Sequence, residues 1–477
     1  MRSQSQSCRS VSAILARYVS LVEDPNALQA IANTLLPVGF WVNPLKSHGA
    51  SLVDYLQAVG IEVEPIEWMP GAWRAREWRS PGQTLAFTAG WYYVQEEIAM
   101  AAVPVLDPQP GEQILDMCAA PGGKTAQIAL RLQNTGLVIA NELHAARMPS
   151  LSTTIARLGL TNVITTQGDG RVLPLPPHQF DRVLVDVPCS GEGNLRRRQH
   201  PRPWQPQHGL RIAAAQKKLL SRALDLVKPG GVVVYSTCTF APEENEAVLD
   251  AVLGDRAYLE PIHLPGLQGQ AGVTQWQGQS YRQDMPLAQR YFPHFNNTGG
   301  FFMAKLRRTD AACLASTEPL EHPTLASVSI DPVAPIQKLQ KDFGLPDTEF
   351  QPYACWATGK KRLWLTQKHC RPIAGLQPQT LGIPVVSYTN LGFKPTTAFL
   401  QHWGAQIQRN VVELRHEQDA LAFVQGETQT LDTNLVSEME PGYIHVRYGA
   451  FQLGCGRQIE GKLQSQLPKT LRWAAKR

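Results

Sequence analysis

Short apolar runs alternate with segments of helical periodicity through the middle of the chain. The runs begin at Gln113, Leu137, Val163, Phe180 and Val232, and most are followed by a stretch of helical spacing. Runs that are apolar on both faces are typical of buried parallel strands, and the intervening helices are typical of crossover connections. The pattern predicts an α/β core over residues 89–308, built as a Rossmann-like, doubly wound sheet.

A different pattern precedes this core. Residues 11–36 have helical spacing, whereas residues 40–46 and 61–66 resemble strands. Because Pro44 cannot donate to a ladder, residues 40–46 are predicted to form an edge strand. Residues 11–88 are therefore expected to form a small α+β domain.

Two further units are predicted after the core. Residues 309–335 are rich in Ala, Ser, Thr and Pro, which predicts a linker. Strand-like alternation over 336–394 predicts a small β-rich domain, and residues 395–477 combine two helical segments with two strands. Their basic residues suit an RNA-binding module, although a solvated basic terminus is an equal alternative: Lys462, Lys469, Arg472, Lys476 and Arg477.

A strand, a tight loop and a helix start lie within Gln113 to Ile128. Gly122 and Gly123 allow the backbone to approach a ligand, at the edge of the sheet where open α/β proteins hold nucleosides. The sequence Gly123-Lys124-Thr125 resembles the end of a P-loop, but Cys118 stands where that motif has glycine. A G-x-G-x-x-G fingerprint is also absent. The loop therefore favours another cofactor, with a ribose and an amino acid.

Two carboxylates are candidates for contacts with such a cofactor. Glu142 ends the second predicted strand, roughly 20 residues beyond the glycines, where a ribose ligand is expected. A solvated glutamate at a strand end is the alternative. Asp169 lies in a loop where it could accept the amino group of an adenine, but its flanking glycines equally suit an aspartate that serves a turn.

Two cysteines follow the ends of the fourth and fifth predicted strands. Cys189 follows Asp186-Val-Pro, and Cys238 follows Tyr235-Ser-Thr. If these strands are neighbours, both thiols face one pocket. One such cysteine alone would be read as a small buried hydrophobe, but two together favour chemistry. No second pair of Cys or His has the spacing of a zinc site.

Composition narrows the class of protein. The 477 residues are 43% hydrophobic and 18% charged, with net charge +5, so the chain is an ordinary globular protein that tolerates a polyanionic partner. Eight cysteines without a disulfide rhythm suit a reducing cytoplasm. No window is apolar enough for a membrane span. We expect a cytoplasmic monomer without a metal.

Four motifs in order resemble the Nol/Nop/Sun family of RNA cytosine-5 methyltransferases. They begin at Asp116, Asp186, Tyr235 and Gly299 and lie within residues 89–308. The flanking regions are more weakly similar to the bacterial small-subunit ribosomal RNA branch, whose members have a PUA-like C-terminal region that binds RNA. The resemblance implies S-adenosylmethionine as cofactor and a cytosine in ribosomal RNA as substrate.

The resemblance also implies roles for particular residues. Cys238 would be the nucleophile that adds to carbon 6 of cytosine, and Cys189 would help to release the product. Asp186 would hold the N3 edge of the base, with Lys124 near the base or the cofactor. The cofactor would be lined by Cys118, Ala119, Ala120, Pro121, Gly122, Gly123, Lys124, Glu142, Arg147, Asp169 and Asp186.

Two basic segments are candidate RNA contacts. Arg196, Arg197 and Arg198 follow the Cys189 motif and would face phosphates if this loop rims the pocket. Aromatic and basic residues also interleave near residue 70, which suits base stacking, although packing is the commoner use of tryptophan: Trp68, Trp73, Trp78, Arg74, Arg76 and Arg79.

Three rival interpretations are compatible with parts of this pattern. The first is a cytosine-5 methyltransferase that acts on tRNA. The second is an exocyclic-amine methyltransferase, but those enzymes have Pro-Pro-aromatic where this chain has Val187-Pro-Cys189. The third is a non-catalytic RNA-binding ribosome-assembly factor, which would be expected to lose Cys238 or the cofactor loop.

Overall fold

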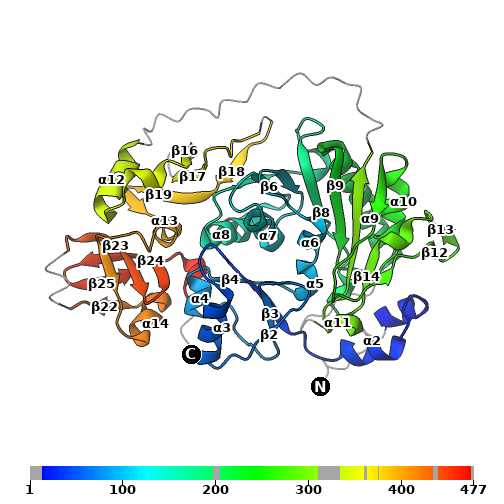
Figure 1. The fold of residues 1–477 in the computed structure, drawn as a ribbon, viewed down its shortest axis with the longest axis horizontal. Helices are drawn as coiled ribbons and strands as arrows, with labels where there is room; N and C mark the ends of the chain where they lie inside the picture. The colour runs from blue at the N-terminus through cyan, green and yellow to red at the C-terminus, as the bar shows by residue number, and fades with distance from the viewer. Residues whose placement is uncertain are drawn as a thin grey trace.

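A computed structural model describes residues 13–196, 205–309, 333–358, 362–373, 375–390, 392–432 and 439–473. Its largest feature is a ten-stranded sheet with five parallel strands at its centre (Figure 1). Five parallel strands lie in the order β9-β8-β5-β6-β7, as the alternation of apolar runs and helices predicts. Their bounds are β5 Gln113–Asp116, β6 Leu137–Glu142, β7 Val163–Gln167, β8 Phe180–Asp186 and β9 Val227–Thr237. The α/β fold class is therefore confirmed.

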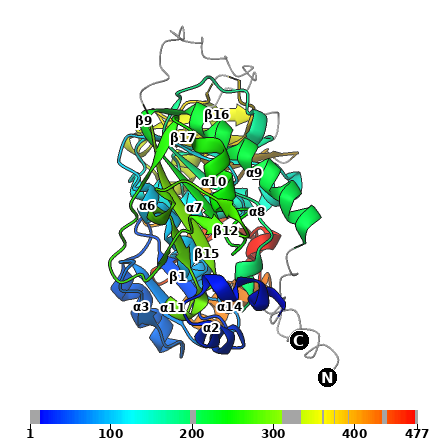
Figure 2. The same cartoon turned by 90° about the vertical axis from the view of Figure 1, so that its right-hand side faces the viewer.

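Helices cover both faces of this sheet with separate hydrophobic cores. On one face, buried Ile128 and Leu151 pack in a cluster with Val234 of β9. On the other face, Leu220 and Val248 pack in a cluster with Tyr235, and Figure 2 shows these helices in front of the sheet. The first face carries α6 (Ala102–Leu106), α7 (Gly123–Arg131) and α8 (Met148–Leu158), and the second carries α9 (Pro206–Leu226) and α10 (Glu246–Leu253).

Antiparallel strands extend the sheet at both edges. Beside β9 lie β15 (Phe301–Arg308), β14 (Gln289–Tyr291), β11 (Gln270–Ala271) and β10 (Ala257–Glu260). At the other edge β18 (Pro378–Leu381) pairs with β7, and Thr380 Oγ1 lies 2.7 Å from Thr165 Oγ1. The C-terminal region is thus tied directly to the catalytic sheet.

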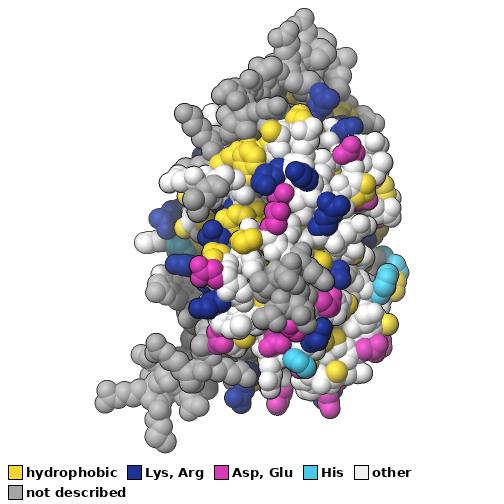
Figure 3. Space-filling view, turned by 90° about the vertical axis from the view of Figure 1, so that its left-hand side faces the viewer, with side chains coloured by type: hydrophobic (Ala, Val, Ile, Leu, Met, Phe, Trp, Pro, Cys, Tyr) yellow, Lys and Arg dark blue, Asp and Glu magenta, His cyan; other side chains and the backbone are white. Residues whose placement is uncertain are grey.

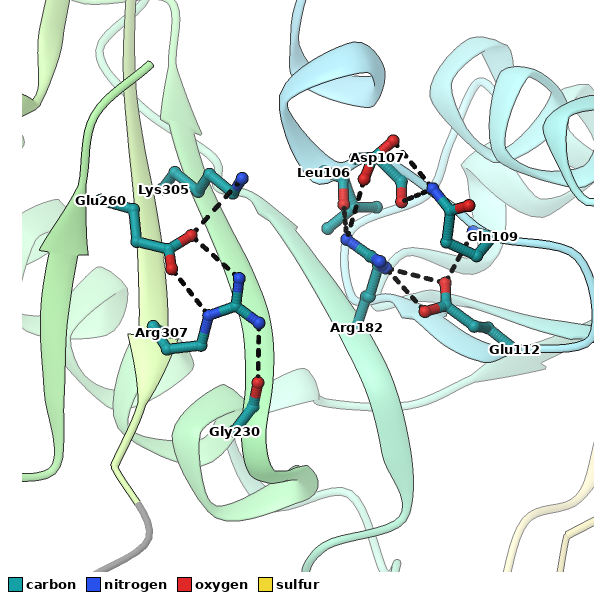
Figure 4. Close-up of polar contacts among 9 residues, drawn as sticks. All are labelled: Leu106, Asp107, Gln109, Glu112, Arg182, Gly230, Glu260, Lys305 and Arg307. Carbon is teal, nitrogen blue, oxygen red and sulfur yellow. Dashed lines mark hydrogen bonds and ion pairs between the residues drawn. The ribbon is translucent and has the colours of Figure 1, made fainter. Parts of the chain in front are cut away.

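Ion pairs tie neighbouring segments together toward the end of the sheet where the parallel strands begin. Arg182 of β8 donates to Glu112 at 2.7 Å and to the Leu106 carbonyl at 2.6 Å, and Arg307 of β15 pairs with Glu260 of β10 at 2.8 Å (Figure 4). These groups lie at the opposite end of the strands from Asp186 and Thr237. Chemistry at the carboxyl edge is therefore separated from this structural end.

The N-terminal region divides between two cores. Strand β1 (Val38–Val42) lies between β3 and β4 and ends before Pro44, so the prediction of an edge strand was wrong. Residues before it, including Tyr18 and Leu28, pack instead in the core with Phe240 and Phe292 on the catalytic sheet. The remaining elements are α2 (Pro25–Ala32), α3 (Gly49–Ala58), β2 (Glu64–Pro65), β3 (Ala72–Ala75), α4 (Leu85–Thr88), β4 (Tyr92–Val94) and α5 (Glu97–Met100).

The C-terminal region contains two more sheets, joined through helix α13 (Thr397–His402) (Figure 1). Phe399 and Trp403 are buried between them, in a cluster with Val386 and Cys455. The first sheet has β16 (Tyr353–Thr358), β17 (Arg362–Gln367), β19 (Ile383–Thr389) and β20 (Gly392–Pro395), with α12 (Val333–Phe343) alongside. The second has β21 (Val411–Glu413), β22 (Thr428–Thr430), β23 (Gly442–Tyr448), β24 (Phe451–Ile459) and β25 (Lys462–Ser465), with α14 (Glu417–Gln425). In the described residues, no helix has both the length and the hydropathy that a bilayer crossing requires.

Candidate active site

The two strand-end cysteines meet at the carboxyl edge of the sheet. Strands β8 and β9 are parallel neighbours, with Asp186 opposite Ser236. Cys189 and Cys238 leave these strands toward each other, and their sulfur atoms lie 3.2 Å apart. The prediction of adjacent strands is confirmed, and the two thiols are in contact as that prediction implied.

The surroundings of the two thiols differ. The hydrogen bond from Cys189 lowers the pKa of Cys238, and Asn194 and Lys124 lower it further, against the effects of burial and of Asp186. Asn194 Nδ2 lies 3.3 Å from the Cys238 sulfur. The same sulfur–sulfur contact and burial raise the pKa of Cys189 well above its usual value. The pair therefore favours a Cys238 thiolate that accepts a hydrogen bond from the Cys189 thiol.

A partly buried ion pair lies beside the sulfur atoms. Lys124 Nζ donates to Asp186 at 2.8 Å, and Ser236 Oγ donates to the other carboxylate oxygen at 2.7 Å. Burial alone would lower the pKa of Lys124, but Asp186 reverses this effect and the net shift is upward. The ammonium group is thus held in its charged form, 5.4 Å from the centre of the Phe301 ring.

The loop after β5 lines a cavity of about 280 Å³ next to this pair. Gly122 has φ +108°, and a Cβ at Gly123 would lie 2.7 Å from the Tyr93 ring, so neither position accepts a side chain without strain. These glycines permit close packing as well as close approach to a ligand. The cavity is lined by Tyr93, Val94, Gln95, Glu96, Ala99, Asp116, Cys118, Ala119, Ala120, Pro121, Gly123, Lys124 and Asp186.

Glu142 and Arg147 are brought to the rim of the same loop. Glu142 is 2% exposed, forms an ion pair with Arg147 at 3.2 Å, and accepts the His144 amide hydrogen at 2.9 Å. Arg147 also donates to the carbonyl of Ala120. The carboxylate predicted to contact a ribose is therefore linked through Arg147 to the loop after β5.

Asp169 lies differently from the other predicted cofactor residues. Its carboxylate pairs with Arg171 at 2.6 Å and accepts the Arg171 amide hydrogen at 3.0 Å, which caps a short 3-10 turn. Like Glu142 and Arg147, it is not among the residues that line the cavity beside Lys124. These contacts suit turn chemistry, the alternative that the flanking glycines suggested, and a contact between Asp169 and a cofactor stays a prediction.

One of the three arginines predicted to contact RNA near the site, Arg196, lies in the described residues, and its prediction was wrong. Arg196 is buried at 4% exposure, and its guanidinium group donates to Thr34, Leu35, Asn297 and Thr298, so it cannot contact phosphate. Arg197 and Arg198 lie outside the described residues.

The interleaved tryptophans serve packing. Trp68 is buried and donates to Glu97 at 3.1 Å, while Trp73 stacks on Phe40 and Trp78 meets the same ring edge-on. Arg74 also pairs with Glu97, at 3.0 Å. The packing alternative is therefore the one that the structure supports.

Two buried glutamates hold the cysteine loops and were not predicted. Glu244 accepts hydrogen bonds from the amide of Ser190 at 2.9 Å and from Gln216 at 3.1 Å. Glu192 accepts from Tyr18 in the N-terminal segment and from Thr239 at 3.4 Å. Glu244 belongs to a motif visible in the sequence, but Tyr18 is 174 residues from Glu192 and no local signal links them.

Asp116 is a third residue that sequence reasoning left without a role. It is buried, it accepts a hydrogen bond from Thr125 Oγ1 at 2.7 Å, and burial raises its pKa to about 6. Asp116 is the last residue of β5 and Thr125 lies in the first turn of α7, so their hydrogen bond fixes the start of α7 relative to the end of β5.

Family models match three successive parts of the chain. Residues 103–307 match the 16S rRNA methyltransferase RsmB/F family, and residues 13–97 match the N-terminal domain of 16S rRNA methyltransferase RsmF. Residues 409–473 match the methyltransferase RsmF PUA domain. The three matches follow the order predicted for the N-terminal, catalytic and PUA-like regions.

Named relatives agree with these matches. Ribosomal RNA small subunit methyltransferase F of Aeromonas salmonicida is 30% identical over 448 residues, which cover 90% of each chain. The mouse 28S rRNA (cytosine-C(5))-methyltransferase is 38% identical over 57% of this chain and 35% of its own length. A fission yeast 25S rRNA (cytosine-C(5))-methyltransferase nop2 is matched over 46% of its length. This chain thus spans less than half the length of these two eukaryotic relatives.

A solved structure shares the fold of the core. The crystal structure of a methyltransferase homolog protein from Pyrococcus horikoshii is 30% identical, with a TM-score of 0.53, and covers 62% of this chain and 98% of its own. Together with the family matches over the N-terminal, catalytic and PUA regions, this places the chain in the RsmF branch of the 16S rRNA methyltransferase RsmB/F family.

Proposed function

We propose that this protein transfers a methyl group from S-adenosylmethionine to carbon 5 of a cytosine in small-subunit ribosomal RNA. The single observation that carries the proposal is the 3.2 Å approach of the Cys189 and Cys238 sulfur atoms at one sheet edge. A fold that served only RNA binding would have no need for two thiols with opposite pKa shifts beside a charged Lys124.

The cavity along the loop after β5 supports the proposed cofactor. Cys118 to Pro121 and Gly123 line it and can lie against the sugar and the amino acid portion. Glu142, which pairs with Arg147 beside this loop, is proposed to accept hydrogen bonds from the ribose hydroxyls. Lys124 offers a positive charge to a carboxylate. When bound, S-adenosylmethionine would supply a methyl group on a sulfonium, an electrophile that unactivated carbon 5 of cytosine cannot use.

Cys238 would supply the activation. Its thiolate would add to carbon 6 of the ring and convert it into an enamine whose carbon 5 is nucleophilic. Asp186 would hold the N3 edge of the base in the protonated form that favours addition. Lys124 and Ser236, which contact Asp186 at 2.8 and 2.7 Å, keep this carboxylate in position.

Cys189 would act in the second half of the reaction. After methylation, the proton on carbon 5 must leave before the bond between Cys238 and carbon 6 can break. Cys189 lies within contact of Cys238. Its own thiol proton would first pass to solvent, and the resulting thiolate would then accept the carbon 5 proton, for which a raised pKa makes it a strong base. Its loss should therefore leave the protein attached to RNA.

The identity of the RNA is the finer part of the proposal. Relatives matched along most of the chain are named small-subunit rRNA methyltransferases, which favours 16S rRNA over tRNA. The target base must leave its stack to reach the thiols, so a loop or a flipped base is expected. A ribosomal substrate also implies a cytoplasmic reaction.

Bisulfite sequencing tests the proposal in cells. RNA from cells with and without the protein should differ at one or a few cytosines of 16S rRNA, with tRNA unchanged. Loss of 5-methylcytosine from tRNA alone would show that the substrate is tRNA. An unchanged pattern in all RNA would favour a non-catalytic assembly factor.

A further inference from the structure

A groove of about 810 Å³ separates helix α8 of the catalytic core from the C-terminal region. One wall is α8, through Met148, Ser152 and Ala156, and the other is formed by strands β17, β19 and β20. Six residues near the C-terminus complete its lining: Gln466, Leu467, Pro468, Thr470, Leu471 and Arg472. Helix α8 lies beside α13 and β19 (Figure 1). The thiols and the loop after β5 do not line it, so the groove is distinct from the active site.

Charge in the groove has one sign. Its described lining includes four basic residues and no Asp or Glu: Arg157, Arg362, Lys394 and Arg472. Arg362 and Arg472 are exposed, and Lys394 donates to Gln466 at 2.9 Å. By contrast, Figure 3 shows basic and acidic side chains intermixed over the outer face of the C-terminal side. A concave surface with only positive charge concentrates an anionic ligand.

The remaining lining suits a ligand that also presents bases and sugars. Gln401 is 4% exposed, and its buried side-chain oxygen has no hydrogen-bond partner in the structure. Hydroxyl and amide groups line both walls: Ser152, Thr153, Gln167, Gln379, Thr380, Ser387, Thr396, Thr397, Gln401, Gln466 and Thr470. Phosphate accepts hydrogen bonds, whereas base edges and ribose both donate and accept them.

We propose that this groove binds a single-stranded segment of the RNA substrate that flanks the target cytosine. The identity of the RNA rests on the proposed function, whereas the existence of a basic groove rests on the structure alone. Positive grooves that follow the backbone are a general mode of single-strand binding. A volume near 810 Å³ is enough for about two nucleotides, since pockets for drug-sized ligands occupy roughly 300–1,000 Å³.

The lining of the groove includes residues next to the loop after β5. Ala145 and Met148 line it and flank Arg147 in the chain, and Arg147 donates to the carbonyl of Ala120 in that loop. Four strand spacings separate β7 from β9 in the sheet, which is about 19 Å. A strand that leaves the groove at Ala145 would therefore reach Cys238 within a few nucleotides.

Salt-dependent binding tests the groove. The full chain is titrated against a fluorescein-labelled 12-nucleotide single-stranded RNA by fluorescence anisotropy at several salt concentrations. Combining Arg362→Glu, Lys394→Glu and Arg472→Glu should weaken binding at least about tenfold and reduce the salt slope by about 2, because each single-strand phosphate contact contributes about 0.7. The control is Arg371→Glu, an exposed residue of the same region outside the groove. Equal losses in both variants, or no loss in the triple variant, would overturn the proposal.

Crosslinking of the unmodified protein gives a second readout that does not depend on variant folding. RNA of the same length with 4-thiouridine should crosslink to peptides from α8, from residues 384–398 and from residues 466–472. Adducts found only on other peptides would refute the groove. A duplex probe that binds as tightly, with the same loss in the triple variant, would refute the single-strand assignment.

Failure of the groove and failure of the proposed function give different results. Under the proposal, the triple variant raises KM for 16S rRNA while kcat at saturating RNA stays unchanged. If the protein methylates no RNA but the triple variant still lowers the salt slope, the groove stands and the proposed function fails. If methylation is normal in the triple variant at limiting RNA, the groove fails and the function stands.

Discussion

Basic side chains have different partners in the candidate active site and in the groove between α8 and the C-terminal sheets. In the pocket, Lys124 is paired with Asp186 at 2.8 Å, and Asp186 is bound in turn by Ser236. Between α8 and the C-terminal sheets, the basic residues lining the groove have no acid beside them among the described lining. Paired charges hold reacting groups in fixed positions, whereas unpaired ones leave a field for a polyanion. Under the two proposals, the paired charges serve the chemistry and the groove serves RNA attachment.

Removal of the proposed nucleophile should have the largest effect. Under the proposed function, Cys238→Ala deletes the atom that activates the base, so methyl transfer should fall by more than about 10⁴-fold. Cofactor affinity, measured by calorimetry, and RNA affinity should stay near those of the unmodified protein. Methylation at the normal rate would mean that no covalent step through Cys238 takes place.

Removal of the second thiol should arrest the reaction later. Cys189→Ala should slow turnover by about 10² to 10³-fold, as expected for the loss of a proton-transfer group. A protein–RNA adduct that survives denaturing electrophoresis should accumulate. The double variant Cys189→Ala with Cys238→Ala is the control and should form none. Normal turnover without adduct would end the assignment of Cys189 to product release.

Asn194 offers a smaller effect confined to the nucleophile. Its Nδ2 atom, 3.3 Å from the Cys238 sulfur, lowers the pKa of that thiol. Asn194→Ala should raise the pKa of Cys238, so the activity at neutral pH should fall about tenfold and recover as pH rises. The rate of alkylation of Cys238 by iodoacetamide as a function of pH measures the shift. An unchanged alkylation profile would show that Asn194 does not tune the thiol.

The smallest effect concerns stability at the junction of the N-terminal unit, α8 and α13. Burial lowers the pKa of His402 to about 3, with Lys46 adding to the effect. Because the folded state binds its proton less readily than the unfolded state, stability is full above the ordinary pKa of 6.5 and declines as pH falls toward 3.

The protein should lose about 2 kcal/mol of unfolding free energy between pH 7 and pH 5 through this residue. Denaturant unfolding of His402→Gln beside the unmodified protein measures it, and the variant should lose correspondingly less. If the unfolding free energies of both proteins depended equally on pH, His402 would have no strongly lowered pKa in the folded state.

Local patterns predicted the sheet and the pocket because they depend on short segments. Apolar runs buried on both faces become parallel strands, and Cys189 and Cys238 meet because β8 and β9 are joined by one crossover helix. Glu142 also lies where strand length and loop spacing predict. These inferences needed only neighbouring residues and the general handedness of such connections.

Long-range contacts explain what the sequence did not reveal. Arg196 is buried because acceptors from Thr34 and Thr298, far away in the chain, surround its guanidinium group. The pairing of β18 with β7 joins segments more than 200 residues apart. Asn194 is close in sequence to Cys189 but acts on Cys238, a relation visible only after the two loops are folded together.

The most direct test of the account is to identify the atom that bonds to the base. RNA that carries 5-fluorocytosine, whose fluorine cannot leave as a proton does, should trap the unmodified protein in the presence of S-adenosylmethionine. Peptide mapping by mass spectrometry should then find the nucleotide on Cys238, with Cys189 unmodified. A nucleotide attached to Cys189, or no covalent complex under conditions that support methylation, would contradict the division of labour between the two thiols.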